Sequence, residues 1–160
     1  MVEVRRAQAR DCEAIARLSG EAVREAGGQA APFEPDLVRK HGFGAQPLIE
    51  IFVAEERRNG PLIGHAIITK SFDTRHAAVT VTLCELYVRP AARGGGVART
   101  LIAAVAQRVA ELGARELIIT TGVEDVTARK FFSAVGAKEA QAVVFRVNAD
   151  GVQWLAAEAR

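Results

Sequence analysis

The sequence predicts an α/β domain that is antiparallel in its first half and has crossover connections in its second half. Two strand patterns flank Asn59-Gly60, a dipeptide that favours the positive φ angles of a tight hairpin turn. A long alternating pattern follows at Val79–Val88, and beyond it apolar stripes with helical spacing alternate with short apolar runs. We therefore expect antiparallel pairing up to residue 88 and strand–helix–strand units after it.

The elements of the first half follow from periodicity and from start and stop residues. Val2 and Val4 alternate with charged residues, as in a short strand with one buried face. Asp11 can cap a helix that ends at Gly27-Gly28. The proline-containing stretch 29–47 predicts a loop with one brief helix, placed where a substrate lid could lie. The hairpin strands are expected at Ile49–Ala54 and at Leu62–Lys70.

The second half contains the long central strand, which ends before Pro90, and the elements that follow it. An apolar stripe from Val97 to Leu112 predicts a helix that Gly113 closes. The remaining expected elements are a strand at Leu117–Thr120, a helix at Val126–Val135, a strand at Val143–Val147 and a turn at Asn148–Gly151.

Length and composition narrow the class of protein. The 160 residues suit one domain spanning residues 1–160, and the net charge of +2 does not favour nucleic acid as a partner. Cys12 and Cys84 form no CxxC motif, and the three histidines lack metal-ligand spacing, so we expect no metal. The charged start is unlike a signal peptide, and no apolar run approaches the ~20 residues of a membrane helix. We therefore expect a cytoplasmic protein that does not bind membranes.

The chemistry concentrates between Val88 and Leu101, where a strand ends, Gly94-Gly95-Gly96 follows and a helix begins. Backbone N–H groups at a helix start lack intrahelical partners, and glycine lets an anion approach them closely. Arg89, Arg93 and Arg99 flank this loop. The pattern predicts an anion site that suits a pyrophosphate.

Two common phosphate motifs do not fit this loop. A P-loop requires Gly-Lys-Ser/Thr at the helix start, where this chain has Gly96-Val97-Ala98. A dinucleotide fingerprint requires a third glycine where this chain has Arg99, and the preceding strand order differs from a Rossmann unit. The remaining pattern is Arg93-x-x-Gly96-x-Ala98, preceded by Tyr87-Val88-x-Pro90.

This pattern resembles the pyrophosphate loop of the GNAT superfamily of acetyl-CoA-dependent N-acetyltransferases, and the resemblance covers nearly the whole chain. Val4-Arg5-Arg6-Ala7 is similar to the start of these proteins, and Ala128-Arg129-Lys130-Phe131-Phe132 is similar to their late helix. Within the superfamily, Gly42-Phe43-Gly44, Gly64-His65-Ala66 and several scattered positions are most similar to the diamine and thialysine acetyltransferase group.

The resemblance implies a mixed, mostly antiparallel sheet with helices on both faces, and acetyl-CoA as co-substrate. The backbone of Leu86, Tyr87 and Val88 would pair with the pantetheine arm. The pyrophosphate would be held by Arg93, Gly94, Gly95, Gly96, Val97, Ala98 and Arg99. Asp125 and Ala128 would lie near the far end of the coenzyme. A homodimer is also implied, because relatives are often dimers.

The expected catalytic positions depart from the diamine group. Phe132 replaces the usual tyrosine acid, and Cys84-Glu85 replaces a Glu-Asp pair. Cys84 shares strand parity with Leu86 and Val88, which predicts a small buried residue. Glu85 is either a satisfied or solvated strand carboxylate, or it binds the substrate ammonium and relays its proton. A covalent acetyl group on Cys84 is least favoured, because no adjacent basic residue would lower the pKa of the thiol.

The expected reaction is transfer of an acetyl group to a primary amine of a small molecule, such as an amino acid or a diamine-like amine. Arg39-Lys40-His41 lies in the segment assigned to the substrate, which disfavours a polyamine. Two alternatives remain open. One is a non-catalytic module that binds acetyl-CoA or CoA, which Phe132 favours, and the other is a protein N-acetyltransferase.

Overall fold

The computed structural model describes residues 1–29 and 33–159. Residues 30–32, which belong to the expected lid at 29–47, lie outside the described residues. The chain forms two compact units, Met1–Gly122 and Val123–Arg160. The single domain over residues 1–160 stays a prediction.

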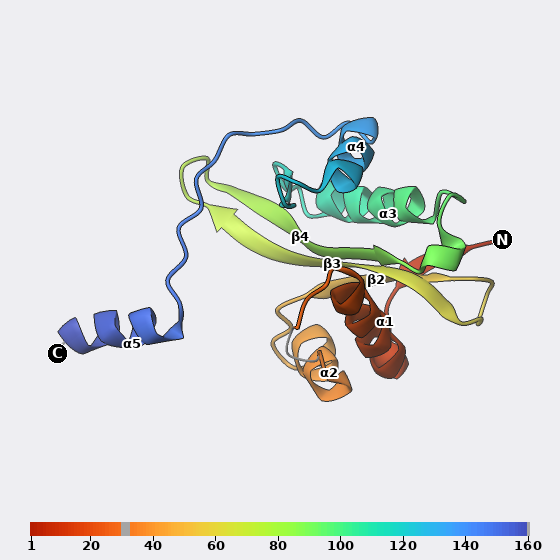
Figure 1. Ribbon diagram of the computed structural model, residues 1–160, viewed down its shortest axis with the longest axis horizontal. Helices are drawn as coiled ribbons and strands as arrows, with labels where there is room; N and C mark the ends of the chain where they lie inside the picture. The colour runs from red at the N-terminus through yellow and green to blue at the C-terminus, as the bar shows by residue number, and fades with distance from the viewer. Residues whose placement is uncertain (30–32, 160) are drawn as a thin grey trace. The chain divides into compact units, whose positions relative to one another are not determined.

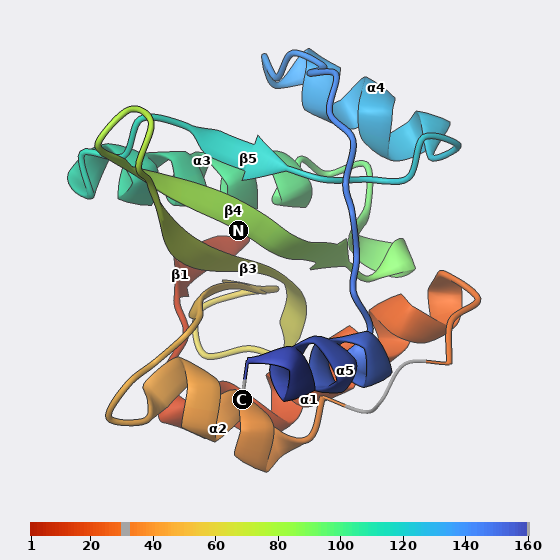
Figure 2. The same ribbon diagram turned by 90° about the vertical axis from the view of Figure 1, so that its left-hand side faces the viewer.

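A five-stranded sheet in the order β1-β2-β3-β4-β5 forms the centre of the first unit (Figure 2). The strands up to β4 pair antiparallel with their neighbours, whereas β5 runs parallel to β4. A mixed, mostly antiparallel sheet is therefore confirmed. The strands span Glu3–Arg6 (β1), Glu50–Glu55 (β2), Leu62–Asp73 (β3), Ala78–Val88 (β4) and Leu117–Ile119 (β5).

Helices cover both faces of this sheet (Figure 1). Helices α1 (Cys12–Glu25) and α2 (Pro35–Phe43) lie on one face, and α3 (Val97–Glu111) lies on the other. The apolar stripe of α3 buries Leu101 and Val105 completely, as the sequence period predicts. The core beneath α1 and α2 consists of Cys12, Ile15, Leu18, Val38, Ile51, Val53, Leu62, Ile67 and Tyr87.

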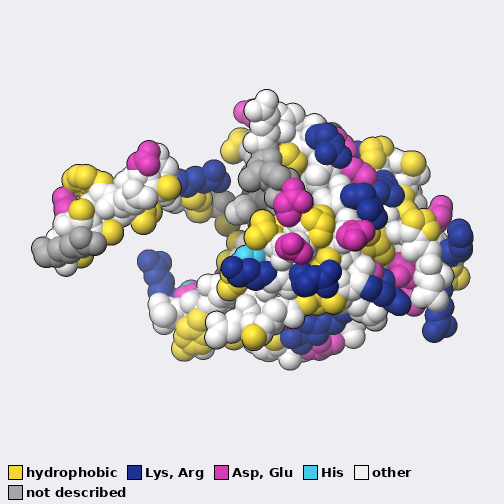
Figure 3. Space-filling view, turned by 90° about the horizontal axis from the view of Figure 1, so that it is seen from below, with side chains coloured by type: hydrophobic (Ala, Val, Ile, Leu, Met, Phe, Trp, Pro, Cys, Tyr) yellow, Lys and Arg dark blue, Asp and Glu magenta, His cyan; other side chains and the backbone are white. Residues whose placement is uncertain are grey.

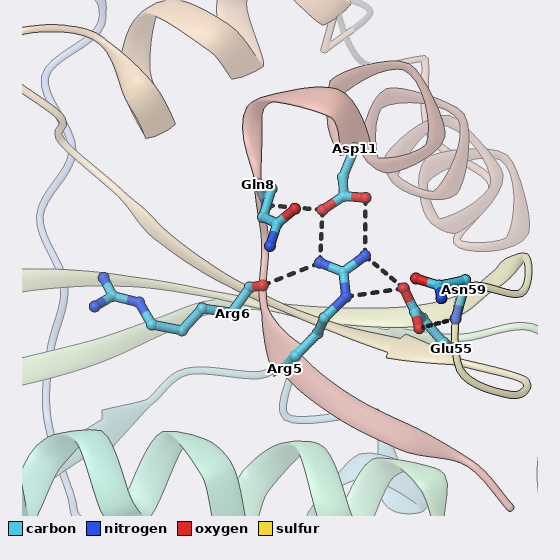
Figure 4. Close-up of polar contacts among 6 residues, drawn as sticks. All are labelled: Arg5, Arg6, Gln8, Asp11, Glu55 and Asn59. Atoms are coloured by element: carbon cyan, nitrogen blue, oxygen red, sulfur yellow. Dashed lines mark hydrogen bonds and ion pairs between the residues drawn. The ribbon is translucent and has the colours of Figure 1, made fainter.

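Arg5 joins β1 to the start of α1 and to the end of β2 (Figure 4). Its guanidinium donates to Asp11 at 2.8 and 3.0 Å and to Glu55 at 2.5 and 2.8 Å. Asp11 also accepts from the Gln8 N–H at 2.7 Å, and Glu55 accepts from the Asn59 N–H at 2.8 Å. Because each carboxylate oxygen is thus occupied, this network fixes the chain entry to α1 and the hairpin between β2 and β3.

A second carboxylate, Glu50 at the start of β2, joins the sheet to α3. It lies 2.8 Å from Arg6, 3.0 Å from Lys70 and 2.8 Å from Arg108. Burial alone would raise the pKa of Glu50, but the hydrogen bonds from Arg108 and Lys70 outweigh it and lower this pKa to about 2.

Strand β4 contains a bulge at Cys84. Ile67 lies opposite Glu85 and Ile68 lies opposite Leu83, so Cys84 is an extra residue without a partner on β3. The bulge reverses the alternation, and Leu83 is buried while Cys84 is exposed. The sequence-based expectation of a buried Cys84 is therefore wrong, because strand parity was counted through an irregular position.

The second unit contains α4 (Val126–Ala134) and α5 (Ala149–Glu158). Asn148 caps α5 by accepting a hydrogen bond from the Gly151 N–H at 2.9 Å, so a helix replaces the expected turn. The expected strand at Val143–Val147 is not formed, and Phe145 is 89% exposed. Alternation predicts only that a segment can be a strand; the hydrogen bonds that make it one come from a neighbouring strand.

Charges of both signs are interspersed on the face that carries α1 and α2 (Figure 3). Within the described residues, no helix has the length and apolar character needed to span a membrane. The same part of the chain contains no cluster of three or more His, Cys, Asp or Glu side chains suited to a metal ion.

Candidate functional site

Strands β4 and β5 pair only over a short distance and then separate. Their register runs from Val81 opposite Leu117 to Leu83 opposite Ile119, where β5 ends. Strand β4 continues from Cys84 to Val88 and remains paired with β3 on its other side. Within the described residues, no strand covers the β5 side of this stretch. The N–H and C=O groups of this stretch that point away from β3 are therefore available to an extended ligand that contains amides, although the Val88 carbonyl already accepts a hydrogen bond from Arg93 at 2.8 Å.

The glycine loop after β4 forms a concave set of backbone donors. Gly94 and Gly96 both have φ of 80°, and Gly96 is the N-cap of α3. A Cβ on either glycine would meet nothing within 4 Å, so backbone conformation, not space, requires glycine there. The first backbone bond of α3 runs from the Thr100 N–H to the Gly96 carbonyl at 3.0 Å. Within the described residues, the N–H groups from Gly94 to Arg99 have no such backbone acceptor, which is the arrangement of backbone nests that bind anions.

Two of the three flanking arginines are paired with α1. Arg89 donates to Glu21 at 2.8 and 2.9 Å. Arg93 donates to the Val88 carbonyl at 2.8 Å and lies 2.7 Å from Glu25. These contacts raise the pKa of both guanidinium groups and lower the pKa of both carboxyl groups. Arg99, on the first turn of α3, is exposed. The guanidinium charges of Arg89 and Arg93 are therefore each offset by a carboxylate of α1.

Tyr87, the single tyrosine, points into the core beneath α1 and is 7% exposed. The guanidinium of Arg93 lies 5.8 Å from the centre of its ring. Burial, followed by the charges of Glu21 and Glu25, raises the pKa of the phenol. Only the backbone of Tyr87 belongs to the open edge of β4.

Glu85 lies on the face of β4 that α1 covers, and its side chain is 29% exposed. Its Oε1 atom accepts a hydrogen bond from Ser19 Oγ at 2.9 Å and lies 2.5 Å from His65 Nε2. Burial would raise the pKa of Glu85, but the hydrogen bonds from His65 and Ser19 outweigh burial, and the pKa is lowered. The carboxylate is thus ionised at neutral pH and partly open to solvent, as a group that binds a cation or accepts a proton must be.

Cys84, beside Glu85, is not activated as a nucleophile. Desolvation and the Glu85 charge both raise the pKa of its thiol. Its Sγ lies 3.8 Å from the Thr82 carbonyl, which is a weak contact. Since the thiolate is the reactive form of cysteine, this environment disfavours an acetyl-cysteine intermediate.

The other expected site residues belong to the second unit. Asp125 is the N-cap of α4 and accepts a hydrogen bond from the Ala128 N–H at 2.9 Å. The ring of Phe132 packs edge-on against Phe131, with ring centres 5.2 Å apart. Glu85, the open β4 edge and the glycine loop thus belong to the first unit. Asp125 and Ala128 belong to the second unit, where they contact each other at the start of α4.

Sequence reasoning missed His65 and the two α1 carboxylates, Glu21 and Glu25. A lone histidine inside the apolar run of β3 was an available signal, because a buried histidine needs a polar partner. A pocket of ≈ 370 Å³ lies elsewhere on the first unit. Its lining includes neither Glu85 nor the glycine loop and consists of Arg5, Arg10, Asp11, Ala14, Arg17, Glu55, Asn59, Gly60, Pro61, Leu62 and Arg89.

Comparison with known proteins defines the class of this protein. The chain belongs to the acetyltransferase (GNAT) family, whose sequence profile matches residues 7–137. It is an acetyl-CoA-dependent N-acetyltransferase, and the resemblance noted on sequence is confirmed.

Two curated relatives are similar in sequence. The thialysine N-epsilon-acetyltransferase of Bos taurus is 27% identical over 145 residues, which cover 86% of this chain and 85% of the relative. The aminoglycoside N(6')-acetyltransferase type 1 of Stenotrophomonas maltophilia is 42% identical over 59 residues, covering 37% of this chain and 39% of the relative. Among solved structures, a probable acetyltransferase is 20% identical, with a TM-score of 0.82 over 91% of this chain and 98% of that one. This last likeness concerns the fold.

Proposed function

We propose that this enzyme acetylates a primary amine of a small molecule, either an amino acid or a diamine-like amine. The observation that supports this most strongly is the ionised, partly exposed Glu85 at the start of the open β4 edge. A carboxylate there can attract an ammonium group to the place where an acyl-bearing ligand would lie along β4.

The same proposal assigns the coenzyme contacts. The open edge from Leu86 to Val88 has the hydrogen-bonding groups to pair with the amides of the pantetheine arm. Residues 93–99, including the left-handed Gly94 and Gly96, have the geometry to hold the pyrophosphate. Asp125 and Ala128 remain proposed contacts at the far end of the coenzyme. The homodimer and the cytoplasmic location stay predictions.

Glu85 acts as the base in the proposed reaction. A substrate ammonium transfers one proton to the carboxylate and becomes a neutral amine. The bound thioester supplies the acetyl group: the nitrogen bonds to its carbonyl carbon, the C–S bond breaks, and the thiolate takes the proton that the nitrogen loses on becoming an amide. Glu85 then returns its proton to water. Water serves as the route to the thiolate, because Phe132 has no proton to give.

The substrate is proposed to be an amino acid or short diamine because of the charges and the relatives. Arg39 and Lys40, on α2, are exposed cations that would repel a polyamine but could pair with a substrate carboxylate. The bovine relative is named for thialysine, an amino acid with a side-chain amine. The aminoglycoside relative makes aminoglycosides the second candidate class.

A panel of amines tests this proposal. Acetyl-CoA turnover is measured with lysine-like amino acids, diamines, spermidine, aminoglycosides and peptide N-termini, and acetyl-CoA binding is measured separately by calorimetry. We expect the highest kcat/KM for an amino acid or a short diamine. Preferred turnover of spermidine, aminoglycosides or peptides would contradict the substrate class. Tight acetyl-CoA binding without turnover of any amine would favour a non-catalytic binding module.

A further inference from the structure

His65 is a fully buried polar side chain on β3, at the centre of the first unit. It is 0% exposed and lies opposite Val53 on β2 and Tyr87 on β4, two residues of the apolar core. Its Nε2 atom lies 2.5 Å from Glu85 Oε1. Its Nδ1 atom is buried without any hydrogen-bond partner among the described residues. Burying a polar group with an unsatisfied nitrogen lowers the stability of the fold, so the single polar contact of His65 needs an explanation.

The lack of a hydrogen-bond partner at His65 Nδ1 indicates which ring nitrogen carries the proton. A proton on Nδ1 would leave a buried N–H without an acceptor, whereas a bare Nδ1 leaves only a lone pair unused. A carboxylate oxygen is acceptor-only, so the group opposite Glu85 Oε1 has to be a donor. The contacts therefore favour a proton on Nε2, which donates to Glu85.

The two donors meet on one oxygen of Glu85. His65 Nε2 and Ser19 Oγ both contact Oε1, and within the described residues Oε2 has no hydrogen-bond partner. Oε2 is not buried, because within the described residues His65 Nδ1 is the one buried side-chain nitrogen or oxygen atom without a hydrogen-bond partner. One oxygen of the carboxylate is thus saturated by the protein, and the other is open.

We propose that His65 is a positioning residue that, together with Ser19, fixes Glu85 so that Oε2 alone faces the substrate ammonium. The inference rests on the proposed function of Glu85 and adds a residue that touches no substrate. It also explains why a histidine occupies the core: the hydrogen bond to Oε1 persists when Oε2 takes a proton, so Glu85 is used and restored without rearrangement.

The charged and titratable groups around this site come from three elements. Strand β3 contributes His65, and strand β4 contributes Cys84 next to Glu85. Helix α1 contributes Ser19, and further along it Glu21 and Glu25, which are paired with arginines. The ring centre of Tyr87 lies 6.3 Å from that of His65, and the charges of Glu21 and Glu25 act on its phenol. Of these groups, His65 and Ser19 contact the Glu85 carboxylate directly. Desolvation and the Glu85 charge together raise the pKa of the Cys84 thiol.

The test compares variants that differ in the donor at this position. His65→Phe keeps an aromatic ring but removes the donor, whereas His65→Gln can place an amide N–H near the position of Nε2. Ser19→Ala removes the other donor. Val53→Ala is the matched control, because it disturbs the same core opposite His65 and leaves the Glu85 contacts in place. The readouts are the pH profile of kcat/KM, KM and kcat for the amine, and a carboxyl NMR titration of Glu85 without substrate.

The expected result is a shift of the acidic limb of the pH profile to higher pH in His65→Phe, since the ionised carboxylate loses a donor. At neutral pH, kcat/KM should fall by about 10-fold, and His65→Gln should recover most of the loss and the limb position. Ser19→Ala should shift the limb in the same direction, and Val53→Ala should lower stability only.

Three outcomes would overturn the inference: an unchanged limb in His65→Phe, equal behaviour of His65→Phe and His65→Gln, or a limb shift in Val53→Ala of the same size. If His65→Phe does not fold, the Ser19→Ala profile decides: an acidic limb shifted to higher pH supports the inference, and an unchanged limb overturns it. If no amine is turned over, the proposed function fails on its own, and the NMR titration still tests this inference: a raised Glu85 pKa in His65→Phe supports it, and an unchanged one overturns it.

Discussion

Gly96 allows the coenzyme loop to be perturbed at a single backbone angle. It caps α3 with φ of 80° and ψ of 4°, a left-handed conformation that alanine adopts at a cost of about 1–2 kcal/mol. A Cβ there would meet nothing within 4 Å, so the cost in the free protein is conformational and no atom has to move. Gly96→Ala should therefore lower the free energy of unfolding by about 1 kcal/mol.

The same substitution should weaken acetyl-CoA binding more than stability alone implies. If the loop relaxes to relieve the strain, its N–H groups no longer converge on one point, and each 1.4 kcal/mol lost corresponds to a tenfold weaker Kd. We expect the Kd from calorimetry to rise about tenfold or more, with stability followed by urea unfolding.

Gly113→Ala is the control for the backbone effect. Gly113 also has positive φ, 60°, and an equally open Cβ position, but it lies after the C-terminal end of α3. It should lose comparable stability and keep wild-type affinity. A Gly96→Ala variant that binds acetyl-CoA like wild type, or equal losses of affinity in both variants, would refute the assignment of this loop to the coenzyme.

Three further substitutions test other parts of the structure. The pKa of Glu50 is lowered from its usual 4.5 to about 2, so its contribution to stability is fully present above about pH 4.5 and is lost as the pH falls towards 2. Over this range, the free energy of unfolding in urea should fall by about 3 kcal/mol more for wild type than for Glu50→Gln. Parallel pH dependences of the two proteins would exclude the effect. Cys84→Ala should keep kcat within about twofold, because the thiol is not activated, and a loss above tenfold would revive the acetyl-cysteine route. Phe132→Tyr should not raise kcat, since a thiol that titrates near 8.5 leaves as a thiolate without a positioned acid, and a clear gain would show that the tyrosine acid was missing.

Sequence periodicity was sufficient for most of the first unit. The long strand expected at Val79–Val88 is β4 at Ala78–Val88, and the hairpin strands and the helix from Val97 lie within a few residues of their expected bounds. These elements carry strong local signals: β-branched alternation, an Asn-Gly turn and an apolar helical stripe. The glycine loop was also predictable, because positive φ is encoded in the residue type itself.

The catalytic details depended on contacts between distant residues. The bulge at Cys84 arises from the register between β3 and β4, and it changed the face on which Cys84 lies. His65 and Ser19 reach Glu85 from positions 20 and 66 residues away in the chain, so no local pattern joins them. The same holds for Glu21 and Glu25, which occupy arginines that the sequence assigns to the anion.

The segment at Val143–Val147 shows the limit of alternation as a signal. Its β-branched residues predict a strand, yet they lie exposed without strand pairing in the second unit. Propensity for a strand is largely a measure of how well a residue packs in a formed sheet. The pattern therefore marks a segment able to pair and leaves the partner unspecified.

The most direct test of the account is the activity of Glu85→Gln. Glutamine can still accept hydrogen bonds from His65 and Ser19, but it cannot take a proton from an ammonium group. With the best amine of the panel, kcat/KM should fall by about 100-fold or more, while the Kd for acetyl-CoA stays within about twofold of wild type. Unchanged kcat/KM in Glu85→Gln would contradict the proposed role of Glu85 as the base.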